Sequence, residues 1–412
     1  MMRISNIMLK NIKSFKDIDL DLNDFNVVIG SCASGKSNLF DIFKFIKDLN
    51  EDFQKVISNR SAVYMKNFNS EKDENCYLKI TFTSNNDKSY SIPIFKNDIE
   101  MFLYFNQVEY ELSFNFKSNF DYEIIKENVV LTYEYKNDNK IIKNQLSLEN
   151  DGDINVRLTN TDDCVDLDDL IPFSVLNVVK HNFQKSKSLI INSALSIVPF
   201  SWSDLFKKIA CYDFNPKFSK FGNQRNGDLN LLEFGDNLSI RLEKILDNSK
   251  DKRSFLNLVN HLLPYIDGIN VDSLIDGRTI FTLNEDYSNV NVPSPFISDG
   301  TVNIIALIVA LFFEKESILF IEEPERNIHP ELLANLIQLM DEISNEKQLI
   351  ITTHNPELLK HIDLENIYFI SRNRDGFSTI TKPINNEIVK PFIDDLGIDE
   401  VFIDNYLGIG NE

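Results

Sequence analysis

Gly30-Ser31-Cys32-Ala33-Ser34-Gly35-Lys36-Ser37 fits the phosphate-loop pattern G-x-x-x-x-G-K-[ST] at every fixed position. The apolar run Val27-Val28-Ile29 before it predicts the end of a buried strand, and apolar residues from Leu39 to Leu49 recur at helical spacing. Glycines let backbone N–H groups approach phosphates, and a helix N-terminus adds partial positive charge. The order strand, glycine loop, helix therefore predicts a nucleotide site in which Lys36 reaches the β- and γ-phosphates and Ser37 binds Mg²⁺.

Polar residues follow two further apolar segments of strand type. Ile318-Leu-Phe-Ile321 leads directly into Glu322 and Glu323, and the apolar segment Gln348–Thr352 precedes His354. Because parallel strands end at the same edge of a sheet, we expect these side chains beside the phosphate loop. Glu322 is predicted to bind Mg²⁺, Glu323 to orient or deprotonate the attacking water, and His354 to donate to the γ-phosphate and hold that water. In isolation, an acidic pair is typical of a solvated helix cap, and a strand-end histidine of a structural role.

A polar tetrapeptide, Ser298-Asp299-Gly300-Thr301, precedes a long apolar helix predicted from Val302 to Phe313. Serine and glycine at such a position are typical of simple helix capping. The functional alternative is that Ser298 and Gly300 present a hydroxyl and backbone donors to a phosphate at the helix N-terminus. The pattern by itself leaves both interpretations open.

The composition is that of an ordinary soluble globular protein, with 43% hydrophobic and 25% charged residues among 412. Lys and Arg number 42 against 63 Asp and Glu, a net charge of -21, so any contact with DNA needs a local basic patch. The four dispersed cysteines indicate neither a zinc site nor a disulfide framework. The longest apolar run, Ile304–Phe313, is about half of the ~20 residues that cross a bilayer, and the N-terminus lacks a signal-peptide core. We therefore expect a cytoplasmic protein outside the membrane.

Changes in periodicity along the chain predict an α/β fold of four parts. Period-two alternation in Tyr77–Thr83, Val108–Phe114 and Val129–Tyr135 indicates antiparallel strands, and helical spacing follows up to about Ile266. Alternating helices and apolar strands from Ile297 onward indicate a mixed, mostly parallel sheet. The predicted parts are an N-terminal lobe with the phosphate loop (1–75), an antiparallel β subdomain (76–165), a mainly helical insertion (166–289) and a C-terminal lobe with Ser298, Glu322, Glu323 and His354 (290–412).

The order of these motifs resembles the ABC-type ATPase heads of the RecF/SMC-like group. More narrowly, it is similar to the AAA-family ATPases of the OLD, retron-associated and related anti-phage systems, through Ile318–Pro330 and Thr352–Pro356 as well as the phosphate loop. Leu9–Phe15 is similar to their opening strand, in which a basic residue, here Lys13, approaches the nucleotide. The matching motifs cover about residues 1–50 and 290–375. The resemblance implies a P-loop NTPase fold of the ABC-ATPase head type.

The resemblance also implies a head-to-tail homodimer that encloses two ATP molecules. Ser298–Thr301 would be the signature motif, which completes the site of the opposite protomer. The sequence departs from the family pattern at Cys32, where an asparagine is common, and at Glu322, where an aspartate is usual. The implied nucleotide-binding residues are Gly30, Ser31, Cys32, Ala33, Ser34, Gly35, Lys36, Ser37, Lys13, Ser298 and Gly300, with Ser37 and Glu322 as metal ligands and Glu323 and His354 as catalytic residues.

The sequence shows no heptad arm, and the segment after Ser371 is too short for an appended nuclease domain. We therefore expect ATP-driven dimerisation to control a separately encoded effector, a nuclease or toxin, in defence against phage. The alternatives are a RecF-like DNA-binding ATPase of repair, the energising subunit of a membrane transporter, and a non-catalytic ATP-binding scaffold. Lys180–Lys187 and Lys217–Arg225, each with an interleaved phenylalanine, could contact nucleic acid, and a solvated charged face is the alternative.

Overall fold

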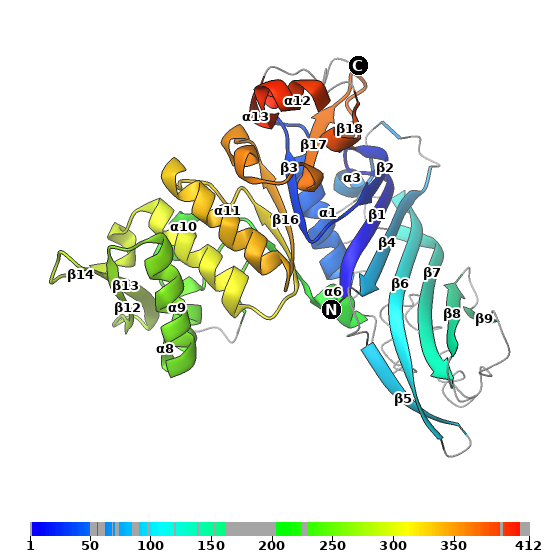
Figure 1. The fold of residues 1–412 in the computed structure, drawn as a ribbon, viewed down its shortest axis with the longest axis horizontal. Coiled ribbons are helices and arrows are strands. Elements are labelled where there is room, and N and C mark those ends of the chain that lie inside the picture. The colour runs from blue at the N-terminus through cyan, green and yellow to red at the C-terminus, as the bar shows by residue number, and fades with distance from the viewer. Residues whose placement is uncertain are drawn as a thin grey trace.

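Three β-sheets organise the part of the chain that the computed structural model describes (Figure 1). The described residues are 2–49, 56, 62–67, 69–70, 74–84, 90–96, 99–118, 121–137, 140–150, 154–160, 203–224, 230–387 and 390–403. The stretch Lys180–Lys187, for which the sequence leaves both nucleic-acid contact and a solvated charged face open, lies outside them.

A six-stranded sheet carries the predicted phosphate loop. Its strand order is β10-β15-β16-β3-β17-β18, and all neighbours are parallel except β17 and β18. Runs of Ile, Leu, Val and Phe make these strands, because a parallel sheet is buried on both faces. The strands are β10 (Ile209–Tyr212), β15 (Ile318–Glu322), β16 (Gln348–Thr353), β3 (Phe25–Ile29), β17 (Ile367–Arg372) and β18 (Ser378–Thr381).

Successive strand residues enter two different hydrophobic cores, as the alternation of side chains across a sheet requires. Val28 and Phe320 belong to the core that contains helix α1 (Lys36–Asp48), whereas Val27 and Ile321 belong to the core on the other face. On the α1 side, Phe320 packs on Phe40 and Phe43, with ring centroids 5.4 and 4.8 Å apart. The phosphate-loop helix is therefore fixed to the sheet by aromatic packing.

Helices cover the opposite face of this sheet (Figure 1). They are α8 (Leu238–Asp247), α9 (Ser249–Leu262), α10 (Asp299–Ile308), the π-helical turn η3 (Val309–Phe313) and α11 (Pro330–Ser344). The helix predicted from Val302 to Phe313 begins three residues earlier, at Asp299, and its last five residues form the π-helical turn, while every residue of α10 from Thr301 on is buried. No helix in the described ranges is both long and apolar enough to span a lipid bilayer.

An eight-stranded antiparallel sheet packs on the α1 side of the molecule. It has the order β2-β1-β4-β6-β7-β8-β9, with β5 paired to β6. The predicted division at residue 76 runs through this sheet, because β1 pairs with β4. Its strands are β1 (Met2–Ile12), β2 (Phe15–Asp21), β4 (Cys76–Ser84), β5 (Tyr90–Lys96), β6 (Ile99–Ser118), β7 (Asp121–Asn137), β8 (Lys140–Asn150) and β9 (Ile154–Asn160).

The predicted helical insertion contains strands that the sequence analysis did not anticipate. β10 joins the parallel sheet beside β15, and a smaller antiparallel sheet forms around β12 and β13. A four-residue apolar strand such as β10 has no periodicity that distinguishes it from a helix segment. The smaller sheet contains β11 (Asn223–Gln224), β12 (Ile266–Ser273), β13 (Arg278–Glu285) and β14 (Asn291–Pro293).

Five short α-helices lie elsewhere in the described ranges. They are α3 (Ala62–Met65), α6 (Ser203–Lys207), α7 (Pro216–Lys220), α12 (Lys390–Leu396) and α13 (Ile398–Ile403).

A buried amide joins the antiparallel sheet to the parallel sheet. Gln348, at the start of β16 and 1% exposed, accepts a hydrogen bond from Ile4 N (2.8 Å). Its Nε2 donates to Ile4 O (2.7 Å) and to Asn23 O (2.9 Å). These three bonds satisfy most of the capacity of the amide, so its burial stabilises the junction of the two sheets.

We predict that Phe320→Ala lowers the free energy of unfolding by about 3 to 5 kcal/mol, because it removes a fully buried ring from between Phe40 and Phe43. Urea denaturation followed by circular dichroism measures the change. Phe296→Ala is the control, since that ring is 80% exposed and its loss should cost no more than about 0.5 kcal/mol. Equal denaturation midpoints for the two variants would contradict the packing described here.

Candidate functional site

The register of the parallel sheet brings the ends of β15, β16 and β3 to one level. Glu322 pairs with Thr352, and Thr353 pairs with Ile29, the last residue before the phosphate loop. The predicted strand–loop–helix unit is confirmed, since β3 ends at Ile29 and α1 begins at Lys36. The polar residues that follow the three strands therefore meet at the carboxyl edge of the sheet.

The backbone of the phosphate loop is left-handed at two positions. Ala33 has φ 63°, and Gly35, the N-cap residue of α1, has φ 117°. A side chain on Gly30 would overlap the Ile370 carbonyl, and one on Gly35 would overlap the Ser378 hydroxyl. Both glycines are thus required by close packing against the β17–β18 hairpin, and Gly35 is also required by its left-handed conformation.

Lys36 lies at the base of this loop and is 7% exposed. Its Nζ donates to Gly30 O (2.6 Å) and Ser31 O (2.9 Å). Burial lowers the pKa of Lys36, and the negative charges of Glu323 and Glu322 oppose that effect. The ammonium is held against the first two carbonyls of the loop, where a phosphate oxygen can replace them as its partner.

Ser37 and Glu322 face each other across the edge of the sheet. Ser37 Oγ donates to Glu322 Oε1 at 2.6 Å, so the longer glutamate reaches the hydroxyl although an aspartate is usual here. Burial raises the pKa of Glu322, and the nearby Asp213 and Glu323 carboxylates add to the rise. A hydroxyl and a carboxylate in a locally negative site are oxygen ligands that suit Mg²⁺, so Ser37 and Glu322 would hold this ion.

Glu323 is held between two donors. Its Oε1 lies 2.7 Å from His354 Nδ1, and its Oε2 accepts from Arg326 Nη2 at 3.3 Å. Burial favours the neutral acid, but the hydrogen bond from His354 and the positive charge of His354 and Arg326 outweigh it and lower the pKa of Glu323. The residue has φ 46°, and its N–H donates to Thr352 O at 2.9 Å. The carboxylate is ionised and oriented beside Glu322.

The structure adds residues to which the sequence analysis gave no role. Arg326 also donates to Asp213 Oδ1 (2.8 Å), which follows β10 at the same sheet edge. Glu325 is 7% exposed and accepts from Thr353 Oγ1, while its Oε2 has no hydrogen-bond partner among the described residues. Burial raises the pKa of Glu325 to about 6. Glu325 and Arg326 stand inside the quoted Ile318–Pro330 motif, but Asp213 carries no sequence signal because β10 was not recognised.

Ser298 and Gly300 lie at the N-terminus of α10. The exposed Ser298 accepts from Thr301 N (3.2 Å), so it caps its own helix. A side chain on Gly300 would overlap the Asn327 carbonyl, and Asn303 Nδ2 donates to Arg326 O at 2.6 Å. The described hydrogen bonds of Ser298 are thus within its own helix end and none joins it to residues 30–37. Two contacts connect this helix end to the loop that carries Arg326.

Lys13 and the second predicted basic stretch have acidic neighbours. Lys13 Nζ contacts Asp41 Oδ2 at 2.7 Å, on the second turn of α1, rather than a residue of the phosphate loop. Its assignment to the nucleotide site therefore stays a prediction. In Lys217–Arg225, Lys220 forms an ion pair with Asp299, while Phe218 and Phe221 are 49% and 59% exposed.

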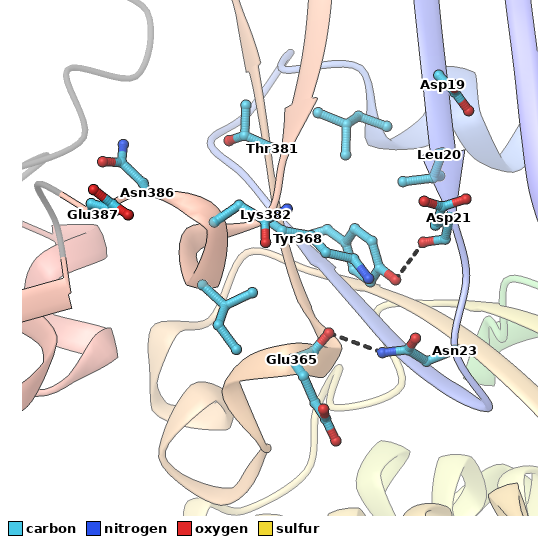
Figure 2. Close-up of a pocket in the computed structure, with 13 residues that line it drawn as sticks. Asp19, Leu20, Asp21, Asn23, Glu365, Tyr368, Thr381, Lys382, Asn386 and Glu387 are labelled. Carbon is cyan, nitrogen blue, oxygen red and sulfur yellow. Dashed lines mark hydrogen bonds between the residues drawn. The ribbon is translucent and has the colours of Figure 1, made fainter.

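A cavity of about 830 Å³ lies at the opposite end of β3 and β17 (Figure 2). Tyr368 donates to Asp21 O (2.7 Å) at its wall, and Lys382 Nζ lies 4.7 Å from the centre of the Tyr368 ring. Of the residues that line it, Asp21 and Asn23 precede β3, Tyr368 lies near the start of β17, and Lys382 follows β18, whereas the phosphate loop follows the other end of β3. This cavity is therefore separate from the cluster of Lys36, Ser37, Glu322 and Glu323.

Comparison with known proteins agrees with the geometry of this cluster. The model of the family described as "AAA domain, putative AbiEii toxin, Type IV TA system" matches residues 25–360. The chain belongs to this AAA family. The match includes the phosphate loop, both glutamates and His354. The resemblance to ABC/AAA-type ATPases of the RecF/SMC/OLD group is thus confirmed, as is the P-loop fold with its mixed sheet.

Two relatives are named "Endonuclease GajA". The protein from Bacillus cereus strain VD045 is 21% identical over 392 residues, which cover 88% of this chain and 57% of the relative. The protein from Bacillus cereus strain HuB5-5 is 24% identical over 260 residues, covering 54% of this chain and 34% of the relative. The chain thus spans 57% of the length of the first relative. Among solved structures, the Smc head bound to the C-winged helix domain of ScpA has a TM-score of 0.49 at 15% identity, covering 92% of this chain and 96% of that chain.

We predict that Glu325→Gln changes the pH dependence of stability. The pKa of Glu325, about 6, lies above the ordinary 4.5, so the native state holds the carboxyl proton more tightly than the unfolded state. The proton therefore stabilises the native state at low pH, and this contribution is lost as the pH rises through about 6. Relative to the variant, the wild type should lose about 2 kcal/mol of unfolding free energy between about pH 4 and pH 7. Urea denaturation at several pH values measures this difference.

The matched control is Glu331→Gln, because the Glu331 side chain is 87% exposed and its replacement should change the free energy of unfolding by no more than about 0.5 kcal/mol. A pH-independent difference between the wild type and Glu325→Gln would show that Glu325 titrates in the same range in the native and unfolded states.

Proposed function

We propose that the chain binds ATP with Mg²⁺ and hydrolyses it. The observation that carries this proposal is the Glu323 carboxylate, held between His354 and Arg326 directly beside the Ser37–Glu322 pair. A base that is ionised, oriented and adjacent to a metal-binding pair is the arrangement that activates water for attack on a phosphate. Membership in the AAA family supports the nucleotide, and the loop geometry supports a triphosphate.

Each residue of the cluster has a separate task in this proposal. The N–H groups of residues 30–37 and Lys36 bind the phosphates, while Ser37 and Glu322 hold Mg²⁺. Bound Mg²⁺ would neutralise charge that develops on the phosphate oxygens. Glu323 accepts a proton from water, or orients that water, at Oε1 or Oε2. Arg326 keeps the carboxylate turned toward this edge, since it bridges Glu323 and Asp213.

The His354–Glu323 contact determines which form of the His354 ring can donate a hydrogen bond to a phosphate. A carboxylate only accepts hydrogen bonds, so Nδ1 donates to Glu323 and the neutral ring has Nε2 as an acceptor. Nε2 can donate to the γ-phosphate only when the ring is an imidazolium. His354 is therefore proposed to bind the γ-phosphate as the doubly protonated ring, which donates through Nδ1 to Glu323 and through Nε2 to the phosphate.

We further propose that Ser298 and Gly300 act on the nucleotide of a second molecule in a head-to-tail homodimer. Support comes from the exposure of Ser298 and from the contacts that join α10 to the loop of Arg326. Because Arg326 also binds Glu323, a partner nucleotide that shifts the end of α10 would act on the catalytic carboxylate. Closure of the dimer and hydrolysis are thus coupled within each protomer.

The dimer is proposed to control an effector of the nuclease or toxin class, encoded separately, in defence against phage. The names of the GajA relatives and the description of the family support this class of effector. The physical basis is that closure on ATP would move the antiparallel sheet and the helices of 203–289 as bodies fixed to the heads. The defence role rests on the resemblance to the anti-phage ATPases.

A RecF-like DNA-binding ATPase of repair is the second candidate. The exposed rings of Phe218 and Phe221, next to Lys217, favour it, because aromatic rings and cations together bind single strands. The ion pair of Lys220 with Asp299 and the net charge of -21 weaken it.

We predict that Glu323→Gln lowers the rate of ATP hydrolysis by at least about 100-fold, because an amide cannot accept the proton of the attacking water. The variant should still bind ATP and should accumulate as an ATP-bound dimer, which light scattering after size-exclusion chromatography measures. Glu331→Gln serves as the control, since Glu331 is exposed on the first turn of α11 and should leave the rate unchanged. A Glu323→Gln variant that hydrolyses ATP at the wild-type rate would refute the assignment of the base.

The same assay with duplex DNA separates the two candidates. A rate that is unchanged by DNA favours control of a separate effector. A several-fold increase that falls steeply with salt favours the DNA-binding ATPase. Failure of the wild type to bind ATP would refute the nucleotide site itself.

A further inference from the structure

A row of hydrogen-bonded serine hydroxyls connects the phosphate loop to β18 and to the β1–β2 turn. Ser378 is the first residue of β18 and is 2% exposed. Its N–H donates to Ser14 O (2.8 Å), so the hairpin β17–β18 is fastened to the β1–β2 turn. Its Oγ donates to Ser34 O, a carbonyl of the phosphate loop, at 2.7 Å. The Ser14 and Ser378 hydroxyl oxygens lie 2.8 Å apart.

The number of protons on each group determines which oxygen donates in each of these hydrogen bonds. A carbonyl has no proton and a hydroxyl has one, so the proton of Ser378 serves Ser34 O, and Ser14 supplies the proton between the two hydroxyls. Ser378 Oγ is thus both an acceptor and a donor. Since Gly35 carries no side chain, the hydroxyl can lie directly against it, and a Cβ at Gly35 would overlap Ser378 Oγ.

The anchored carbonyl determines where the next N–H points. The peptide between Ser34 and Gly35 is trans, so the Ser34 C=O and the Gly35 N–H point in opposite directions. Holding the carbonyl toward Ser378 therefore holds the Gly35 N–H on the opposite side of the peptide, away from the Ser378 hydroxyl. Gly35 at φ 117° has little steric preference of its own, and without the anchor this peptide could rotate.

We propose that Ser378 is a positioning residue for the phosphates of a bound nucleoside di- or triphosphate. The proposal rests on the proposed nucleotide function of the loop, and it deepens that function by assigning a residue outside the family match of 25–360. Ser378 does not touch the nucleotide. It acts through Ser34 O, by keeping the Gly35 N–H in the orientation that binds phosphate.

The test is Ser378→Ala against Thr379→Ala. Thr379 is the next residue on β18, is exposed, and its hydroxyl contacts Ser371 rather than the loop. We expect Ser378→Ala to raise the KM for ATP and the Kd for ADP about fivefold, the effect of one lost hydrogen bond, while kcat at saturating ATP stays within about twofold. Thr379→Ala should change none of these constants, and both variants are assayed well below the melting temperature of Ser378→Ala, which the lost buried hydrogen bonds should lower.

A KM equal to that of the wild type in folded Ser378→Ala would overturn the proposal, as would a fall in kcat at unchanged KM. If Ser378→Ala fails to fold, Ser14→Ala tests the same row of hydroxyls from its other end, and it should raise KM in the same direction by about twofold. An unchanged KM in Ser14→Ala would then overturn the proposal. Absence of ATP binding in the wild type would instead refute the proposed function, so the two failures are distinguishable.

Discussion

The parallel hydrogen bonds that join β15, β16 and β3 are the constraint on which the rest of the structure depends. They place Glu322 beside Thr352, and Thr353 beside Ile29, so three segments that are distant in sequence end at one level. A register change of a single residue in any strand would turn its side chains to the other face and withdraw its polar end from the cluster. Chemistry at this edge thus depends on an exact ladder in a fully buried sheet.

Burial of both faces explains what surrounds that ladder. One set of strand residues packs on α1 and the antiparallel sheet, and the alternate set packs on α10 and α11. The same packing that hides the apolar strands also sets the start of α1 at the end of the phosphate loop and the start of α10 beside the loop of Arg326. Stability and function therefore use the same helices, and a repacking of either core would move a helix terminus.

Sequence reasoning found the parts of the site that are local. The phosphate loop, Glu322, Glu323 and His354 each follow an apolar segment directly, so a pattern along the chain locates them, and parallel pairing brings them together. Asp213 and Ser378 could not be recognised from the sequence, because each acts through a distant partner. Asp213 binds Arg326, 113 positions away, and Ser378 binds Ser34, 344 positions away. The strand β10 was missed because four apolar residues carry no period. Lys13 was expected at the nucleotide, but the pattern that placed it on the opening strand could not show that Asp41 would be its partner.

The position of β3 in the middle of the sheet has a consequence for synthesis on the ribosome. Asn26 in β3 donates to Leu349 O, a carbonyl 323 positions later in the chain. At about 5 to 20 residues per second, the apolar β3 waits on the order of tens of seconds for the neighbours that bury it. Throughout that interval the nascent chain carries a hydrophobic strand without its sheet neighbours, so the early part of this protein exposes apolar surface of the kind that chaperones bind.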